Sequence, residues 1–303
     1  MHGIASGSVA SGTSKFVSAP DGLRLHVREY GPHTGSLRPV VCLPGLSRTT
    51  EDFHELATAL SSSATSPRRV LALDYRGRGL SDYDPNPAHY TVSVELADVM
   101  AVLVARGCAP AVFIGTSRGG ILTMLLAASR PTAIAGVVLN DIGPVIETKG
   151  LMRIKSYVGK MPQPRTFEDG SQILRRLFDV QFPKLTNDHW LAAAKRAWRE
   201  NDGGLVPTYD IQLTEALADV DSERPLPPLW AQFDGLVHVP MMVIRGENSD
   251  ILSPDTVAAM RARRKNLDVI EVPDQGHAPL LIEPDIIERI AGFIEHCDKS
   301  AKS

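Results

Sequence analysis

Three polar side chains that lie far apart in the chain could together perform nucleophilic chemistry, and a serine is the first of them. Ser117 stands in a Gly-x-Ser-x-Gly-Gly pattern at residues 115–120, between an apolar run rich in β-branched residues and a stretch with helical spacing. A serine hydroxyl is a weak nucleophile, so it needs an exposed position on a sharp bend, a neighbouring base and backbone N–H groups aimed at the oxygen that becomes charged. The pattern therefore predicts that Ser117 is a nucleophile on a strand-to-helix corner.

The other two side chains follow short apolar runs later in the chain. Residues 241–246 run into a polar turn that ends with Asp250, and residues 268–272 lead through a second turn to His277. A serine triad built on strand-to-helix turns has the chain order serine, acid, histidine. This order predicts that His277 is the base and that Asp250 is the acid that orients it.

Asp141 is an alternative acid, because it follows the apolar run at residues 135–140 and begins a tight turn near the strand ends, where ligands bind in open α/β sheets. Arg118, next to the serine, would also need a carboxylate partner in a mostly buried site. We hypothesise that Arg118 pairs with Asp141 and leaves Asp250 to His277. A bond between Asp141 and the imidazole would contradict this hypothesis.

With two further segments, Leu-Pro-Gly-Leu-Ser at residues 43–47 and Asp-Tyr-Arg-Gly-Arg-Gly-Leu-Ser at residues 74–81, the chain resembles serine hydrolases of the α/β-hydrolase fold. The resemblance extends from about residue 16 to about residue 296. It implies an α/β architecture with a mostly parallel eight-stranded sheet flanked by helices. It also implies that residues 74–81 brace the edge of the active site and take no part in the chemistry.

The resemblance assigns an oxyanion hole to the backbone N–H groups of Leu46 and Arg118. Relatives commonly have His-Gly where this chain has Pro44-Gly45, but a backbone donor tolerates any side chain beside it. Ser47 and Arg48 follow this loop and are candidates to face the substrate, with a structural role as the alternative for each.

Patterning along the chain predicts the elements that must position these residues. Apolar runs without alternation predict central strands that are covered on both faces of a parallel sheet, at residues 39–43, 70–74, 111–114 and 135–140. Residues 16–18 and 23–30 bracket Asp-Gly and predict a hairpin, on whose exposed face we expect His26. Helical spacing predicts helices at residues 51–60, 93–106 and 286–294.

Residues 144–236 differ from the rest of the chain in composition. Prolines separate short helical runs, no strand pattern intervenes, and all three tryptophans fall in this segment. We therefore expect a helical cap inserted after the sixth strand, with the α/β core at residues 15–143 and 237–298 and a disordered tail at residues 1–14. The aromatic residues of the cap would form its own small core or line the pocket, and Trp190 and Trp230 are candidates for the pocket.

Composition narrows the partners. A formal net charge of −3 provides no broad basic field, so we expect neither nucleic acid nor an anionic membrane surface as a partner. Cys42, Cys108 and Cys297 are too widely spaced for a disulfide framework or a zinc site, and no metal-ligand spacing, phosphate-binding loop or dinucleotide motif suggests a cofactor. No apolar run is long enough to span a bilayer and no export signal is evident, so we expect a cytoplasmic protein; its oligomeric state stays open.

These patterns favour a hydrolase of small to medium, largely apolar carboxylic esters that works through an acyl-enzyme intermediate. A serine at the corner excludes the mechanisms of this fold that use an aspartate nucleophile there. The alternatives are a carbon–carbon bond hydrolase of diketone-type ring-cleavage products, a lactonase and an amidase. A ligand-binding receptor on the same scaffold is an alternative of another class. The presence of all three triad residues argues against this alternative.

Overall fold

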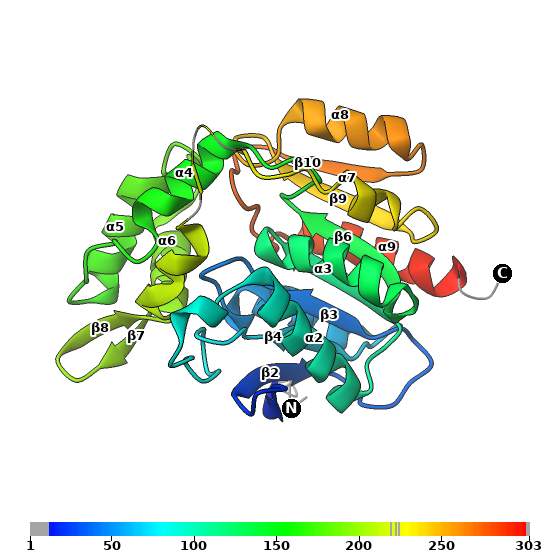
Figure 1. Cartoon of the computed structure of the whole chain (residues 1–303), viewed down its shortest axis with the longest axis horizontal. Helices are drawn as coiled ribbons and strands as arrows, with labels where there is room; N and C mark the ends of the chain where they lie inside the picture. The colour runs from blue at the N-terminus through cyan, green and yellow to red at the C-terminus, as the bar shows by residue number, and fades with distance from the viewer. Residues whose placement is uncertain (1–11, 219, 222, 224, 301–303) are drawn as a thin grey trace, which may run out of the picture.

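An eight-stranded sheet forms the centre of the molecule (Figure 1). The computed structural model describes residues 12–300 except 219, 222 and 224. The strand order is β1-β2-β4-β3-β5-β6-β9-β10, in which β2 is antiparallel to both of its neighbours and the remaining pairs are parallel. The strands are β1 (Thr13–Ser18), β2 (Arg24–Tyr30), β3 (Val40–Leu43), β4 (Val70–Leu73), β5 (Ala111–Thr116), β6 (Ile134–Asn140), β9 (Met241–Gly246) and β10 (Asp268–Val272).

The central strands are apolar throughout because both faces of the sheet are covered. On β3, Val41 and Leu43 pack into one buried cluster while Val40 and Cys42 pack into another on the opposite face. Helices α2, α3, α7 and α8 cover the first face, and α1 and α9 cover the second. These helices are α1 (His54–Ser61), α2 (Val92–Arg106), α3 (Arg118–Ser129), α7 (Trp230–Asp234), α8 (Pro254–Arg263) and α9 (Pro284–Ser300), with short 3-10 turns η1 (Thr50–Phe53), η2 (Pro87–His89) and η3 (Pro131–Ala133).

The segment between β6 and β9, which we call the insertion (residues 144–236), builds a separate layer beside the sheet (Figure 1). A small core of its own holds it together, with Leu174, Trp190 and Trp198 buried. Its other elements are α4 (Thr148–Tyr157), α5 (Phe167–Phe178), α6 (Asn187–Ala197), β7 (Trp198–Asn201), β8 (Gly204–Pro207) and η4 (Ile211–Leu217). The last helix, α7, packs against α3 of the core instead.

The expectation that no strand lies in the insertion is wrong, because β7 and β8 pair as an antiparallel hairpin. Gly203 in its turn has φ +88, a left-handed conformation that glycine adopts without strain. Each strand has only four residues, and three of those in β7 are exposed. Such short strands carry no hydrophobic alternation for a pattern to detect.

Two expectations about the N-terminal region also need correction. Residues 1–11 of the predicted tail lie outside the described part of the chain, but Thr13 and Ser14 belong to β1. His26 is only 2% exposed, and both ring nitrogens have partners: Nδ1 lies 2.7 Å from Asp74 Oδ2 and Nε2 lies 3.0 Å from Ser14 Oγ. The alternating pattern of β2 fails at this position because a buried carboxylate satisfies the imidazole.

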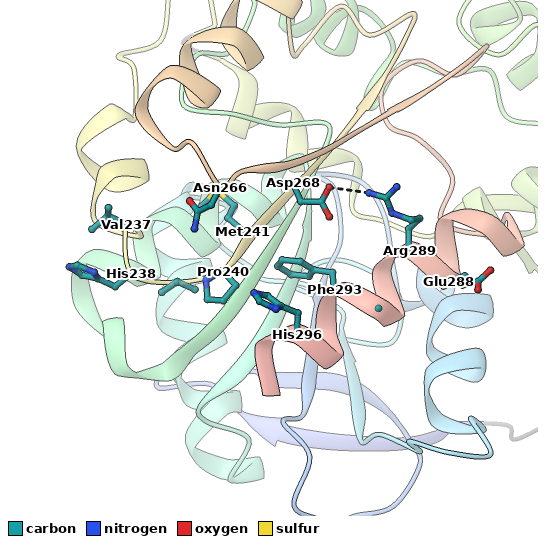
Figure 2. Close-up of a pocket in the computed structure, with 12 residues that line it drawn as sticks. Val237, His238, Pro240, Met241, Asn266, Asp268, Glu288, Arg289, Phe293 and His296 are labelled. Carbon is teal, nitrogen blue, oxygen red and sulfur yellow. Dashed lines mark hydrogen bonds and ion pairs between the residues drawn. The ribbon is translucent and has the colours of Figure 1, made fainter. Parts of the chain in front are cut away.

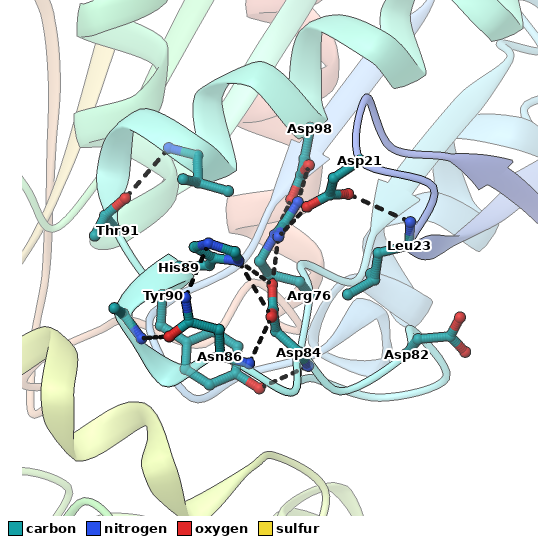
Figure 3. A network of polar contacts seen from close by, with 12 residues as sticks. Asp21, Leu23, Arg76, Asp82, Asp84, Asn86, His89, Tyr90, Thr91 and Asp98 are labelled. Carbon is teal, nitrogen blue, oxygen red and sulfur yellow. Dashed lines mark hydrogen bonds and ion pairs between the residues drawn. The ribbon is translucent and has the colours of Figure 1, made fainter.

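Residues 74–81 form a polar bracket at the edge of the sheet, centred on Arg76 (Figure 3). The buried guanidinium of Arg76 donates two hydrogen bonds of 2.7 Å to Asp98 on α2 and one each to Asp21 and Asp84. Burial alone would lower the pKa of Arg76, but hydrogen bonds to these carboxylates, Asp98 foremost, raise it well above its usual range. The bracket therefore ties the β1–β2 turn to α2 through one permanently charged side chain.

Candidate active site

Ser117 occupies a strained corner between β5 and α3. Its backbone angles are φ 50 and ψ −111, a positive φ that is uncommon for a residue with a side chain. The neighbouring glycines make the corner sterically allowed, since a Cβ at Gly119 would lie 2.0 Å from the carbonyl oxygen of Leu43, and one at Gly115 would lie 2.5 Å from the backbone nitrogen of Gly120. The serine therefore projects from a bend that only this arrangement of glycines permits.

The structure brings Ser117 and His277 together at the carboxyl ends of the parallel strands. His277 Nε2 lies 2.8 Å from Ser117 Oγ, and its Nδ1 lies 2.8 Å from Asp141 Oδ2. The Asp141 side chain is fully buried, and that of His277 is 7% exposed. Hydroxyl, imidazole and carboxylate thus form one continuous chain of short contacts.

Asp141 is held firmly by the neighbouring strand. Its Oδ1 accepts a hydrogen bond of 2.9 Å from the backbone N–H of Gly246, and its Oδ2 accepts one of 2.6 Å from the hydroxyl of Ser249. Asp141 itself has φ 54, so the chain turns sharply directly after β6. These two hydrogen bonds fix the orientation of the carboxylate.

The preferred acid, Asp250, does not occupy this position. Arg153 on α4 binds it in a bidentate pair, with Nε to Oδ2 at 2.6 Å and Nη2 to Oδ1 at 2.8 Å. Burial favours the neutral form of Asp250, but the hydrogen bonds and charge of Arg153 outweigh this and lower its pKa. The prediction that Asp250 contacts the imidazole is therefore wrong, and the alternative acid, Asp141, makes that contact. Chain order could not decide between them, since both follow β5 and precede His277.

The proposed pairing of Arg118 with Asp141 is also wrong. Arg118 Nε donates a hydrogen bond of 2.7 Å to Oε2 of Glu95, a residue of α2 that is fully buried. The requirement for a carboxylate partner was correct, but sequence reasoning missed Glu95. In the first turn of a helix a glutamate is usually exposed, where it interacts favourably with the helix dipole, so nothing in the local pattern indicated its burial.

The loop after β3 lies directly against Ser117. A Cβ at Gly45 would lie 3.9 Å from the Cβ of Ser117 and 3.3 Å from the Cγ of Arg48. Leu46 follows in this loop, and Arg118 is the first residue of α3, where backbone N–H groups lack partners within the helix. The two residues expected to supply backbone donors thus flank Ser117 from different elements.

Comparison with known proteins agrees with this architecture. A family model described as the alpha/beta hydrolase family matches residues 40–289. The chain belongs to the alpha/beta hydrolase family. The 3-hydroxybutyrate-oligomer hydrolase of Cupriavidus necator is 33% identical to this hydrolase over 281 residues, which cover 88% of this chain and 91% of that protein.

Two further comparisons agree with the assignment to this family. The 2-(acetamidomethylene)succinate hydrolase of Mesorhizobium japonicum is 29% identical over 277 residues, which cover 90% of this chain and 92% of that protein. A crystal structure of an alpha/beta hydrolase from Novosphingobium aromaticivorans superposes with a TM-score of 0.87 at 40% identity, covering 94% of this chain and 99% of that chain. The predicted fold and family are therefore confirmed, and this protein is a hydrolase.

The pocket of this hydrolase lies between the sheet and the insertion and has a volume of about 430 Å³. Ser117 and His277 form part of its wall. Much of the remaining wall is apolar and comes largely from the insertion, including Ile154, Met161, Phe178, Phe182 and Trp190. A pocket with so much apolar lining and a few charged groups suits a small organic molecule.

Three of the four residues expected to contact substrate line this pocket, namely Ser47, Arg48 and Trp190. The Arg48 side chain is 33% exposed and donates two hydrogen bonds of 2.6 Å to Asp52. Trp230 does not line the pocket, so its assignment was wrong. It lies on α7, where its ring packs edge-to-face against Phe233 with 5.8 Å between the ring centroids. The guanidinium of Arg263 lies over the same indole ring.

A second cavity, of about 580 Å³, lies where strands β9 and β10 begin (Figure 2). It is lined by the first residues of β9 and β10 and by α9, and an ion pair of 3.0 Å between Asp268 and Arg289 crosses its rim. None of the 12 residues that line it carries a hydroxyl or thiol group. In parallel strands the starts and ends lie at opposite edges, so this cavity is remote from Ser117.

In the described part of the chain, no helix is both long enough and apolar enough to cross a membrane.

Proposed function

We propose that this hydrolase cleaves carboxylic esters by nucleophilic catalysis, with Ser117 as nucleophile, His277 as base and Asp141 as the acid that orients it. The observation that carries the proposal is the chain of contacts from Ser117 Oγ through the imidazole to the Asp141 carboxylate, each 2.8 Å long. This distance is within reach for proton transfer. The constellation is recognised by geometry and not by position in the chain.

The proposed reaction begins when Ser117 Oγ attacks the ester carbonyl carbon and His277 Nε2 takes the hydroxyl proton. The carbonyl oxygen becomes negatively charged, and the backbone N–H groups of Leu46 and Arg118 stabilise it. When the carbon–oxygen bond breaks, His277 gives the proton to the departing alcohol. Water, deprotonated by the same imidazole, then attacks the acyl carbon. The bond from this carbon to Ser117 Oγ breaks, the imidazole returns the proton to Oγ, and the carboxylic acid leaves.

Asp141 would act on His277 rather than on the substrate. Its contact with Nδ1 holds the tautomer in which Nε2 can accept a proton, and its charge stabilises the imidazolium that forms. The N–H of Gly246 and the hydroxyl of Ser249 keep the carboxylate in place.

For the substrate, we propose esters of small to medium size with largely apolar groups, bound beneath the insertion acting as a cap. The apolar lining and the volume of about 430 Å³ support this class. The similarity to a 3-hydroxybutyrate-oligomer hydrolase supports esters of short hydroxy acids within it. Such a substrate ends in a carboxylate, for which Arg48, a partly exposed side chain that also pairs with Asp52, is the candidate partner in the pocket wall.

Labelling with a fluorophosphonate probe tests the nucleophile. We expect the wild-type protein to be labelled and Ser117→Ala to be unlabelled, while Ser47→Ala, which removes another hydroxyl from the same pocket, keeps the label. An unlabelled wild-type protein would overturn the proposal and would favour a binding protein on this scaffold.

Relative efficiencies test the reaction class. We expect kcat/KM to be higher for nitrophenyl acetate, butyrate and a 3-hydroxybutyrate dimer than for a dienoate diketone or a nitrophenyl amide. A diketone preferred by tenfold or more would replace the ester proposal with carbon–carbon bond hydrolysis, because the same triad serves both reactions and the pocket decides between them.

A further inference from the structure

A buried charge cluster lies behind the nucleophile and takes no direct part in the proposed reaction. Glu95 on α2 is fully buried between two guanidinium groups, with Oε2 2.7 Å from Nε of Arg118 and Oε1 2.7 Å from Nη2 of Arg78. The Arg78 side chain is also fully buried, and that of Arg118 is 12% exposed. Removing three charges from water carries a large desolvation cost that offsets their mutual attraction, so such a cluster is weak evidence for a role in stability alone.

Arg78 connects this cluster to the loop after β3. Its Nε donates a hydrogen bond of 2.8 Å to the carbonyl oxygen of Leu46. The hydroxyl of Tyr75, from the same bracket, donates one of 3.2 Å to the carbonyl oxygen of Pro44. These carbonyl groups belong to the peptides on either side of the one that carries the Leu46 N–H. Two hydrogen bonds thus fix the loop on both sides of that donor.

Arg118 connects the cluster to the other donor. Its backbone N–H is the second group assigned to the oxyanion hole, while its side chain reaches back to Glu95. The corner that carries this N–H is strained at Ser117 and has no side-chain cap. A contact that restrains the residue directly after the strained position therefore restrains the donor itself.

We propose that Glu95 is a positioning residue that sets the distance between the two backbone donors of the oxyanion hole. This inference rests on the proposed function. One carboxylate holds Arg118 on α3 and, through Arg78, the loop that contains Leu46. Glu95 does not touch the substrate and acts only through the two arginines.

The charges of the cluster agree with this role. Burial alone would raise the pKa of Glu95, but the charges of Arg78 and Arg118 outweigh burial and lower it, so the carboxylate stays ionised. Two guanidinium groups against one carboxylate leave an excess of one positive charge in a largely desolvated place. A buried positive charge behind the donors also favours the negative charge that develops in front of them.

Three variants test the inference by the split between kcat and KM. Glu95→Gln and Arg118→Met each remove the link, and we expect kcat to fall by about 10- to 100-fold with KM within about twofold, since losing one oxyanion donor outright costs about 100- to 1,000-fold. Arg118→Lys keeps a cation that can reach Glu95, and we expect it to retain several times more kcat than Arg118→Met. A boronic acid that mimics the tetrahedral state should lose affinity in parallel with kcat.

Asp98→Asn is the matched control, because Asp98 lies one turn further along α2 and pairs with a different buried arginine, Arg76 (Figure 3). We expect it to lower the melting temperature as much as Glu95→Gln does but to leave kcat per folded molecule unchanged. Folded Glu95→Gln and Arg118→Met with wild-type kcat would overturn the inference, as would equal losses of kcat in Asp98→Asn. In either case, persistent labelling of Ser117 would leave the proposed function standing.

Discussion

The turn after β6 and the loop after β9 each present an aspartate near the same pocket, yet the two aspartates face different partners. Asp141 is fully buried and contacts His277, whereas the Asp250 side chain is 17% exposed and binds Arg153 from the insertion. Adjacent parallel strands end at the same edge of a sheet, so either loop could bring a carboxylate close to the imidazole. The difference shows that the direction of the loop, and not chain order, decides which carboxylate contacts the imidazole.

Hydrogen bonds between the two loops explain why Asp141, and not Asp250, contacts the imidazole. Asp141 comes directly after the last residue of β6, while Asp250 lies four residues beyond Gly246 at the end of β9. The β9 loop uses its first turn to donate hydrogen bonds to Asp141 from Gly246 and Ser249. At Asp250 the chain meets α4, and Arg153 of that helix binds the carboxylate. The loop after β9 therefore supports the aspartate of the neighbouring loop.

The strongest test of this comparison exchanges each carboxylate for an amide. Asp141→Asn should lower kcat by about 1,000- to 10,000-fold, because an amide oriented by the same donors favours the wrong imidazole tautomer. Asp250→Asn, the matched variant from the other loop, should retain kcat within about threefold. Initial rates with a nitrophenyl butyrate substrate measure both. The reverse ranking would return the catalytic role to Asp250.

Much of the fold could be predicted because it depends on local patterns. The buried strands have apolar residues on both faces, and the Gly-x-Ser-x-Gly corner needs glycines at fixed spacing whatever the rest of the chain does. The contact between Ser117 and His277 could be predicted because each residue follows a short strand-and-turn pattern that is visible in the local sequence. Neither inference required knowledge of distant contacts.

The remaining features depend on contacts between distant parts of the chain. Three features depend on which side chains meet across elements. They are the contact of Asp141 and not Asp250 with the imidazole, the pairing of Arg118 with Glu95, and the burial of His26 against Asp74. A single sequence states which charges need partners but not which partner they find. The same limit explains the wrong prediction that Trp230 lines the pocket, since the position of this residue depends on α7 packing against α3.

A smaller effect is expected from the hydroxyl that links the two loops. Ser249→Ala removes the 2.6 Å hydrogen bond to Asp141 and should lower kcat by about tenfold, since a hydrogen bond to a charged group contributes about 1.5–3 kcal/mol. Ser253→Ala, four residues on, removes the N-cap of α8 and a hydrogen bond to the Thr256 hydroxyl, and should cost about 1 kcal/mol of stability with kcat unchanged. Steady-state kinetics with urea unfolding separates the two effects. Equal kcat for both variants would mean that the Ser249 hydroxyl does not support Asp141.

For Asp250 we expect an effect on stability in place of catalysis. The pair with Arg153 is bidentate and mostly buried, so Asp250→Asn should lower the free energy of unfolding at pH 7 by about 1–2 kcal/mol, between the values for exposed and buried pairs. A double-mutant cycle with Arg153→Met isolates the pair. A coupling energy near zero would show that Asp250 does not anchor the insertion.

The smallest expected effect is the pH dependence of the difference in unfolding free energy between the wild type and Asp250→Asn. Arg153 lowers the pKa of Asp250 in the folded protein below its ordinary value of about 3.9. A depressed carboxyl pKa stabilises the folded state above the unfolded value, and this contribution disappears as the pH falls through the folded pKa. The difference in unfolding free energy between wild type and Asp250→Asn should thus be constant from pH 7 to about pH 5 and should shrink below pH 4. Groups that titrate in both proteins cancel in the comparison, so a difference that persisted undiminished at pH 2.5 would mean that the anchor is not an ion pair.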